Sequence, residues 1–127
     1  MIAGTGIDLI EVGRIRRILE KRGDRFIEKV FTEEERAYCA RQKDPAVHFA
    51  ARFAAKESCL KALGLGMGYV GWKEMEVISS PSGQPELNLR GKGQEMMIKR
   101  GIARLFLSLS HTPREAVAVV IAEGVEK

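Results

Sequence analysis

The sequence of 127 residues predicts a single α+β domain in which helices pack on a mostly antiparallel sheet. Three observations favour this class: an alternating segment opens the chain, helical segments follow it, and two pairs of strands separated by a helix complete it. No linker, low-complexity tract or internal repeat divides the chain. Residues 1–127 are therefore expected to form one domain.

The first strand is predicted in residues 1–12, MIAGTGIDLIEV. Apolar residues occur on both alternating faces, which is typical of a strand inside a sheet. Gly4 and Gly6 share a face with Asp8 and would let another backbone or a ligand come close. Because a buried carboxylate is costly, Asp8 is expected either to accept backbone or lysine hydrogen bonds or to bind a metal.

Three helices are predicted next. Residues 13–31 have helical apolar spacing, with a break expected at Gly23 and Asp24, since Asp24 can cap a second segment. Thr32 and Glu35 form the spacing of a capping box, which begins another helix. Pro45 opens the third, and Gly64 is a natural stop just past its end.

The second half of the chain is predicted to be mainly strands. Residues 72–89 indicate two strands around a Ser/Pro/Gly turn, residues 91–101 a helix with a glycine stop, and residues 103–124 a hairpin. The last strand contains AVAVVIA, which is continuously apolar, so we expect it to be central in the sheet.

The composition sets broad limits on function. The net charge of +4 allows acidic partners, including nucleic acid, although 30% charged residues of mixed sign is ordinary for a soluble protein. Cys39 and Cys59 have neither C-x-x-C nor zinc spacing, so both are expected to be reduced thiols in a cytoplasmic protein. The sequence has no signal-peptide pattern and no 18-residue apolar stretch, and we expect neither secretion nor a membrane.

The segment RFAAKESCLKALG, residues 52–64, carries charges on a helix that has no obvious solvent face. Large apolar residues lie on one side and small residues on the other, so both sides are expected to be covered. Charges in such places need partners, a metal or a charged ligand. An intrahelical Glu57–Lys61 pair is one explanation. An anionic ligand held through a divalent cation would also use Arg52 and Lys56.

Two further patterns suit a phosphate ligand. Magnesium commonly takes one or two protein carboxylates together with substrate phosphates, and Asp8 and Glu57 could supply them, with Lys56 and Lys61 beside the phosphates. A strand end and turn near residue 110 offer hydroxyls, an imidazole and turn backbone; these residues are Ser110, His111 and Thr112. Ordinary turn chemistry explains that stretch equally well.

A row of basic residues is predicted on the first helix. Arg14, Arg17, Lys21 and Arg25 follow helical spacing with Ile18 beside them, and Phe26 can add apolar contact. The row is either a solvated face or a docking surface for an acidic helix or nucleic acid. The few aromatic residues lack a stacking motif, which weighs against a nucleic-acid-binding module.

Five motifs in order resemble the holo-acyl carrier protein synthases, the small type of 4'-phosphopantetheinyl transferase. The motifs are GIDLIEVGRI, FTEEE, RFAAKESCLKALG, SGQPEL and LSLSHT. Two departures from the family pattern are Ser58, where alanine is frequent, and Gln84, where a basic residue is frequent. The latter puts one contact of that turn in doubt.

The resemblance implies a reaction and a homotrimer with sites between subunits. The 4'-phosphopantetheine arm of coenzyme A moves to a serine of apo-acyl carrier protein in support of fatty acid biosynthesis, and adenosine 3',5'-bisphosphate is released. By the same resemblance, Asp8 and Glu57 hold Mg²⁺ on the pyrophosphate and Lys61 neutralises charge on the phosphates. Arg52, Ser110, His111 and Thr112 grip the nucleotide with its 3'-phosphate, while Gly83 and Pro85 shape a neighbouring loop.

Some assignments stay open at this point. The base that deprotonates the serine could be a Mg-bound water, Glu57 or Glu35. The basic row, with Ile18 and Phe26, is the expected surface for the acidic carrier protein. Alternatives to the reaction are a nucleic-acid-binding module, an adaptor for acidic proteins and another Mg-dependent transferase.

Overall fold

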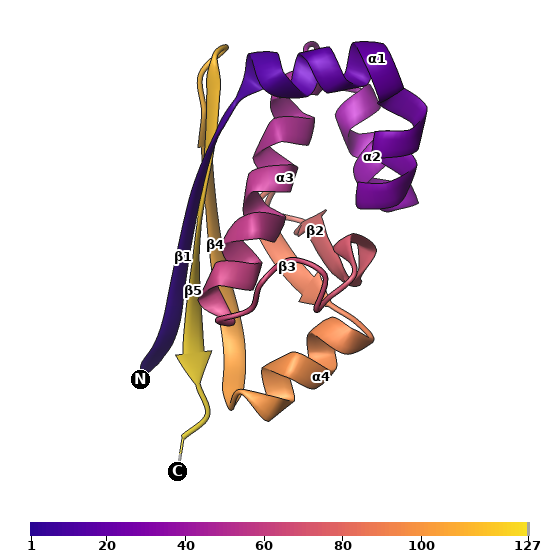
Figure 1. The fold of residues 1–127 in the computed structure, drawn as a ribbon. Helices are drawn as coiled ribbons and strands as arrows, with labels where there is room; N and C mark the ends of the chain where they lie inside the picture. Colours follow the sequence, from indigo (N-terminus) through magenta and orange to yellow (C-terminus); the bar gives the residue numbers. More distant parts are fainter. Residues whose placement is uncertain (127) are drawn as a thin grey trace.

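The computed structural model describes residues 1–126 and confirms the α+β class (Figure 1). The helices and strands follow one another in the predicted order. Their bounds are β1 Ile2–Glu11, α1 Val12–Val30, α2 Glu33–Ala40, α3 Pro45–Ala62, β2 Met75–Ser79, β3 Pro85–Leu89, α4 Lys92–Lys99, β4 Ile102–His111 and β5 Glu115–Gly124. A short 3₁₀ helix, Trp72–Glu74, precedes β2.

The main sheet has three antiparallel strands in the order β1-β5-β4. The central position of β5 confirms the prediction from its apolar run. The prediction that the first strand is an inner one is wrong within one chain, because β1 is an edge strand. Its apolar outer face is open, with Ile7 and Leu9 each 61% exposed. The alternating apolar pattern predicted that both faces of this strand are buried, but a single chain buries only the inner face.

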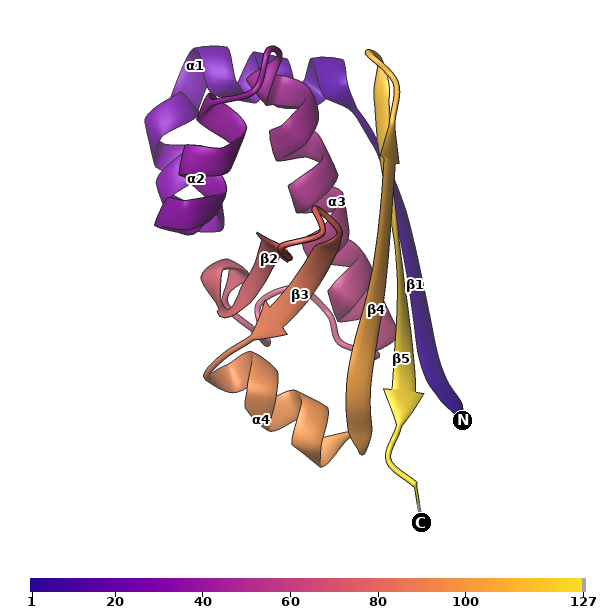
Figure 2. The ribbon, with the colours of Figure 1, turned by 180° about the vertical axis from the view of Figure 1, so that it is seen from behind.

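Helix α3 covers the inner face of this sheet and forms the middle layer of the molecule. Figures 1 and 2 show the sheet on one side of α3 and α1, α2 and the β2–β3 hairpin on the other. Gly4 and Gly6 allow the close approach, since a Cβ at Gly4 would overlap the Ala62 carbonyl oxygen and one at Gly6 that of Ser58. Both predicted features, cover on two sides of α3 and close backbone contact, are confirmed.

The predicted helix boundaries are also confirmed. The Thr32 hydroxyl accepts a hydrogen bond from the Glu35 amide at 3.2 Å, and Glu35 Oε1 accepts one from the Thr32 amide at 2.9 Å. Pro45 is in the first turn of α3, and Gly64 follows that helix with φ of +70°. In α1 the backbone is non-helical at Arg22, which kinks the helix one residue before the expected break.

The outer layer packs on α3 through aromatic side chains. Phe31 lies 4.8 Å from Phe49 and 5.7 Å from Phe26 between ring centroids, and Phe53 lies 5.2 Å from Trp72. Hairpin β2–β3 is a separate two-stranded sheet on this side. None of the helices in residues 1–126 combines the length and apolar character that crossing a bilayer would need.

Candidate active site

One group of predicted residues meets at the β1 edge of the sheet. Asp8 is on the inner face of β1, and Glu57 and Lys61 are one turn apart on α3. Lys61 Nζ donates to the Ile7 carbonyl oxygen at 2.8 Å and to Asp8 Oδ1 at 3.4 Å. Asp8 Oδ2 is buried and has no hydrogen-bond partner within residues 1–126. A buried carboxylate oxygen without a donor is suited to a cation.

The Glu57 carboxyl lies against that of Asp8. Burial raises the pKa of Glu57, and the adjacent Asp8 carboxylate raises it further, while Arg14 and Lys61 oppose this. Two carboxylates that face each other at neutral pH repel unless a cation lies between or beside them. The only salt bridge of Lys61 within residues 1–126 is with Asp8, so the intrahelical Glu57–Lys61 pair considered above is not formed.

The Asp8–Glu57 pair fits a magnesium ion. Magnesium keeps several waters and typically takes one or two carboxylates plus substrate phosphates. Residues 1–126 hold no cluster of three or more histidine, cysteine or carboxylate side chains that would suit a metal bound by protein alone. The donor set therefore fits a metal that is completed by a phosphate-bearing substrate.

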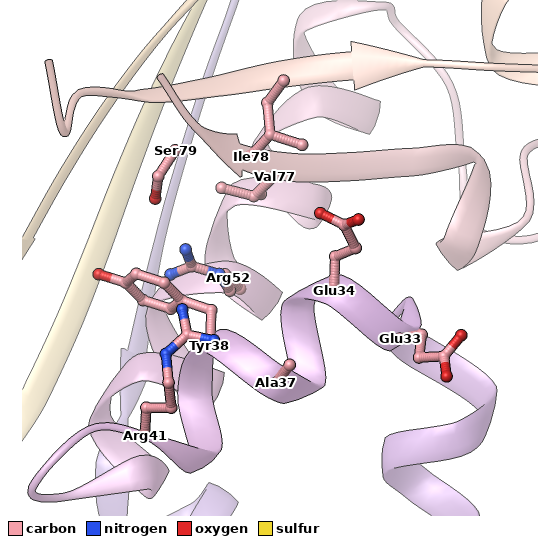
Figure 3. A pocket seen from close by; sticks show the side chains of 9 residues that line it. All are labelled: Glu33, Glu34, Ala37, Tyr38, Arg41, Arg52, Val77, Ile78 and Ser79. Carbon is pink, nitrogen blue, oxygen red and sulfur yellow. The ribbon is translucent and has the colours of Figure 1, made fainter. Parts of the chain in front are cut away.

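A second group lines a pocket of about 530 Å³ on the other side of α3 (Figure 3). Arg52 reaches the pocket from α3, Tyr38 and Arg41 from the end of α2, and Ser79 from the end of β2. Arg52 is only 3% exposed, yet its Nε has no hydrogen-bond partner within residues 1–126. A buried cation with a free donor beside a pocket is suited to an anionic ligand.

The end of β4 lies near this pocket. The His111 ring is 5.3 Å from the His48 ring, which is 5.9 Å from the Tyr38 ring. Burial lowers the pKa of His48, and the nearby charges of His111 and Arg52 add to this effect. Ser110 precedes His111 on β4 and is exposed. Imidazole and guanidinium groups therefore surround one region.

Thr112 has the turn role considered above. Its hydroxyl accepts hydrogen bonds from the amides of Arg114 at 3.2 Å and Glu115 at 3.1 Å in the β4–β5 turn. The hydroxyl proton is free to be donated, so this arrangement is compatible with a phosphate contact as well.

Gly83 and Pro85 belong to the turn between β2 and β3. Gly83 has φ of +88° and donates to the Ser80 carbonyl oxygen at 2.7 Å, and Pro85 begins β3. The turn follows Ser79, which lines the pocket, so it lies near the Arg52 group and not at the Asp8 edge.

The two groups are not brought together within one chain. Asp8 is on β1 and His111 is on β4, and β5 separates these strands. Their backbones are thus about 10 Å apart before side chains are considered. A ligand that used both groups of one chain would have to span this separation and pass α3, whereas a second chain could place its own Arg52 group beside the Asp8 edge.

Lys56 does not lie where the sequence predicted it. The side chain is fully buried, and its Nζ donates to Glu35 Oε1 at 2.7 Å and to the carbonyl oxygens of Val30 and Trp72 at 2.9 Å each. All three donors of the ammonium are used inside the protein. The expectation that Lys56 flanks phosphates is therefore corrected: its environment is that of a structural residue.

Glu35 is the salt-bridge partner of Lys56, and both of its carboxylate oxygens accept hydrogen bonds within the protein. Besides Lys56, Oε1 accepts the Thr32 amide, and Oε2 accepts the Val77 amide at 2.7 Å. The side chain is 1% exposed. Glu35 is thus removed from the possible bases for the incoming serine.

The basic row on α1 is exposed but is not one continuous row. Arg14, Arg17 and Lys21 precede the kink at Arg22, whereas Arg25 follows it and leaves the helical spacing. Ile18 is half-buried. Phe26 packs against Phe31 and Phe53, each 5.7 Å away, so the core takes up its ring.

Sequence reasoning missed Tyr38, Arg41 and His48. The spacing of Tyr38 and Arg41 on α2 places them on one side of that helix, but nothing in the sequence showed that this side faces Arg52. Isolated aromatic, arginine and histidine residues carry no motif, and only the packing of α2 against α3 brings Tyr38 and Arg41 close to His48 and Arg52.

Comparison with known proteins identifies the class. Residues 4–120 match the family model described as "4'-phosphopantetheinyl transferase superfamily". The match covers most of the chain, so the chain belongs to this superfamily, whose members are transferases.

More specific relatives agree in sequence and fold. A holo-[acyl-carrier-protein] synthase of Syntrophus aciditrophicus is 50% identical over 127 residues, which is 99% of each chain. The crystal structure of such a synthase from Neisseria meningitidis has a TM-score of 0.89 and 33% identity, covering 97% of this chain and 99% of that one. One from Bacillus anthracis, in complex with CoA (3',5'-ADP), has a TM-score of 0.81 and 36% identity over 98% and 99%. Within the superfamily, the chain is an enzyme of the holo-[acyl-carrier-protein] synthase type.

Proposed function

We propose that this chain transfers the 4'-phosphopantetheine arm of coenzyme A to a serine hydroxyl of apo-acyl carrier protein. The observation that carries the proposal is the Asp8–Glu57 carboxylate pair, with its unpartnered Oδ2 and with Lys61 beside it. A two-carboxylate site beside a lysine suits a magnesium ion on a pyrophosphate. The names of the relatives, and the coenzyme A in the Bacillus anthracis structure, support the same substrate.

In this reaction the serine oxygen attacks the phosphorus that carries the pantetheine arm. The new phosphorus–oxygen bond forms as the pyrophosphate bond breaks, and adenosine 3',5'-bisphosphate leaves with the negative charge. Magnesium, held by Asp8 and Glu57, would supply charge stabilisation of the phosphates. The Lys61 ammonium lies next to Asp8 and would offset charge on the leaving group.

The serine proton needs an acceptor. Glu35 is excluded as this acceptor, because its carboxylate oxygens already accept hydrogen bonds from Lys56 and Val77. Of the acceptors named above, Glu57 and a water bound to the metal remain, and either would lie at the Asp8–Glu57 pair beside the phosphates.

We also propose that the site is completed in a homotrimer. Two features support this: the open apolar face of the sheet, where Ile7 and Leu9 are 61% and Phe106 47% exposed, and the separation of the two groups of site residues within one chain. A neighbouring chain that covers the face can bring its Arg52 group to the Asp8 edge of the first chain.

The remaining parts of the proposal concern partner and location. The exposed cations of α1 would receive an acidic carrier protein, and the modified carrier would serve fatty acid biosynthesis. Cys39 and Cys59 are both free and buried, which is consistent with the cytoplasmic location expected from the sequence.

One experiment tests the reaction. The purified chain is incubated with apo-acyl carrier protein, coenzyme A and Mg²⁺, and the carrier is weighed by mass spectrometry. We expect a gain of one phosphopantetheine arm and none without the metal. An unchanged carrier together with tight binding of DNA or RNA would favour the nucleic-acid-binding alternative instead.

A further inference from the structure

Tyr38 contacts a cation for which residues 1–126 supply no hydrogen bond or salt bridge. The Arg52 guanidinium carbon lies 3.9 Å from the centroid of the Tyr38 ring, a close cation–π distance. Arg52 is nine-tenths or more buried and makes no side-chain hydrogen bond or salt bridge within residues 1–126. The ring of Tyr38 is therefore the contact that fixes this guanidinium.

A second guanidinium lies over the same ring. Arg41, one turn further along the chain, has its guanidinium carbon 5.9 Å from the Tyr38 centroid. Both arginines line the pocket of about 530 Å³. Gathering two positive charges on one aromatic ring is unfavourable without a counter-charge, and a dianionic group would supply it.

The acidic residues of the pocket lie away from the two arginines. Figure 3 shows Arg41, Tyr38 and Arg52 gathered at one end of the lining, with Ser79 nearby, and Glu33 and Glu34 at the other end. The arginine end thus has cationic donors and a hydroxyl but no carboxylate.

We propose that Tyr38 is a positioning residue that holds Arg52 and Arg41 so that both pair with the phosphomonoester of coenzyme A. The inference rests on the proposed function, because it takes coenzyme A as the substrate. A phosphomonoester carries a charge of about −1.5 to −2 at neutral pH and three acceptor oxygens, which matches two guanidinium forks. Tyr38 touches neither the phosphate nor the reacting atoms and acts only through the arginines.

The test compares coenzyme A with dephospho-coenzyme A, which lacks the phosphomonoester. We expect Tyr38→Leu to raise the KM for coenzyme A about tenfold, with kcat and the KM for dephospho-coenzyme A nearly unchanged. Tyr38→Phe keeps the ring and should stay within about twofold of the wild type for both substrates. Arg41→Gln, at an exposed side chain, should raise only the KM for coenzyme A, and Lys99→Gln on the remote α4 should raise neither.

A binding experiment separates this inference from the proposed function. Calorimetry with adenosine 3',5'-bisphosphate and with adenosine 5'-monophosphate needs no turnover. We expect the wild type and Tyr38→Phe to prefer the bisphosphate, and Tyr38→Leu and Arg41→Gln to lose most of that preference. A wild type that does not distinguish the two nucleotides, or variants that weaken both equally, would overturn the inference while leaving phosphopantetheine transfer intact. Absence of transfer with the preference retained would instead contradict the proposed function.

Discussion

At the scale of single residues, the proposed metal site makes Asp8 and Glu57 necessary for activity but not for folding. Asp8→Asn and Glu57→Gln keep the shape of each side chain and remove its charge. If these carboxylates hold the metal, each variant should lose several kcal/mol of transition-state stabilisation, on the order of 1,000-fold in rate, while remaining folded. Turnover is measured across a Mg²⁺ titration, and near wild-type activity at any metal concentration would show that the residue is not a ligand.

The raised pKa of Glu57 predicts how stability depends on pH. A carboxyl whose pKa is higher in the folded state favours folding below its unfolded value and loses that contribution as pH rises through the folded value. Without metal, Glu57→Gln should therefore be more stable than the wild type at pH 7, and the difference should vanish below about pH 4. Urea unfolding at both pH values measures this, and a variant that is less stable at pH 7 would contradict the close carboxylate pair.

Two lysines on α3 offer a matched comparison. Lys56 is buried in a salt bridge with Glu35, whereas Lys61 is exposed beside Asp8. Lys56→Met leaves a buried carboxylate unpaired and should cost about 3–5 kcal/mol of unfolding free energy. Lys61→Met should lower turnover with little change in the free energy of unfolding. Equal stability of the two variants would mean that the buried pair is not needed for folding.

The same two lysines show what the sequence could and could not predict at this scale. That both charges needed partners followed from the cover on each side of the helix. Which partner each would take did not, because Glu35 and the carbonyl oxygens of Val30 and Trp72 come from distant parts of the chain. Asp8 and Glu57 could be found because each is a carboxylate on an element that the sequence predicts to be covered, and the family resemblance pairs them as metal ligands.

At the scale of elements, the kink of α1 divides the basic row. Arg14 opposes the raised pKa of Glu57, so its charge also acts on the carboxylate site. Arg17 and Lys21 are cleaner probes of docking, since both precede the kink and are exposed. The double variant Arg17→Glu with Lys21→Glu should raise the KM for the carrier protein and make that KM less sensitive to added salt. The KM for coenzyme A should stay nearly unchanged.

The matched control is Arg25→Glu, beyond the kink. It should have a smaller effect, because individual exposed charges contribute only about 0–1 kcal/mol. A rise in both Michaelis constants for the double variant would place Arg17 and Lys21 at the nucleotide or at a subunit interface.

Element types and order were predictable, but the strand neighbours were only partly so. Residues at helix ends, such as Thr32 and Pro45, act locally, so the helix starts that they mark could be inferred from the neighbouring residues. The edge position of β1 could not, because the apolar residues Ile7 and Leu9 indicate that something covers them without indicating whether it is the same chain.

At the scale of the whole molecule, the open sheet face predicts assembly. Sedimentation at micromolar concentration should show three chains. Ile7→Asp, which puts a charge in the middle of that face, should dissociate them and abolish activity, whereas Lys99→Gln on the remote α4 should do neither. A fully active monomer would rule out the shared site.

The position of α3 between two layers has a consequence for mixtures of chains. One side of this helix presents Glu57 and the other presents Arg52, so in a ring each copy would serve two neighbouring sites with different halves of its surface. Chains with Glu57→Gln and chains with Arg52→Gln should each be inactive alone. Refolded together in equal amounts, they should recover activity at about a quarter of the sites, because one site in four joins the intact half of each kind.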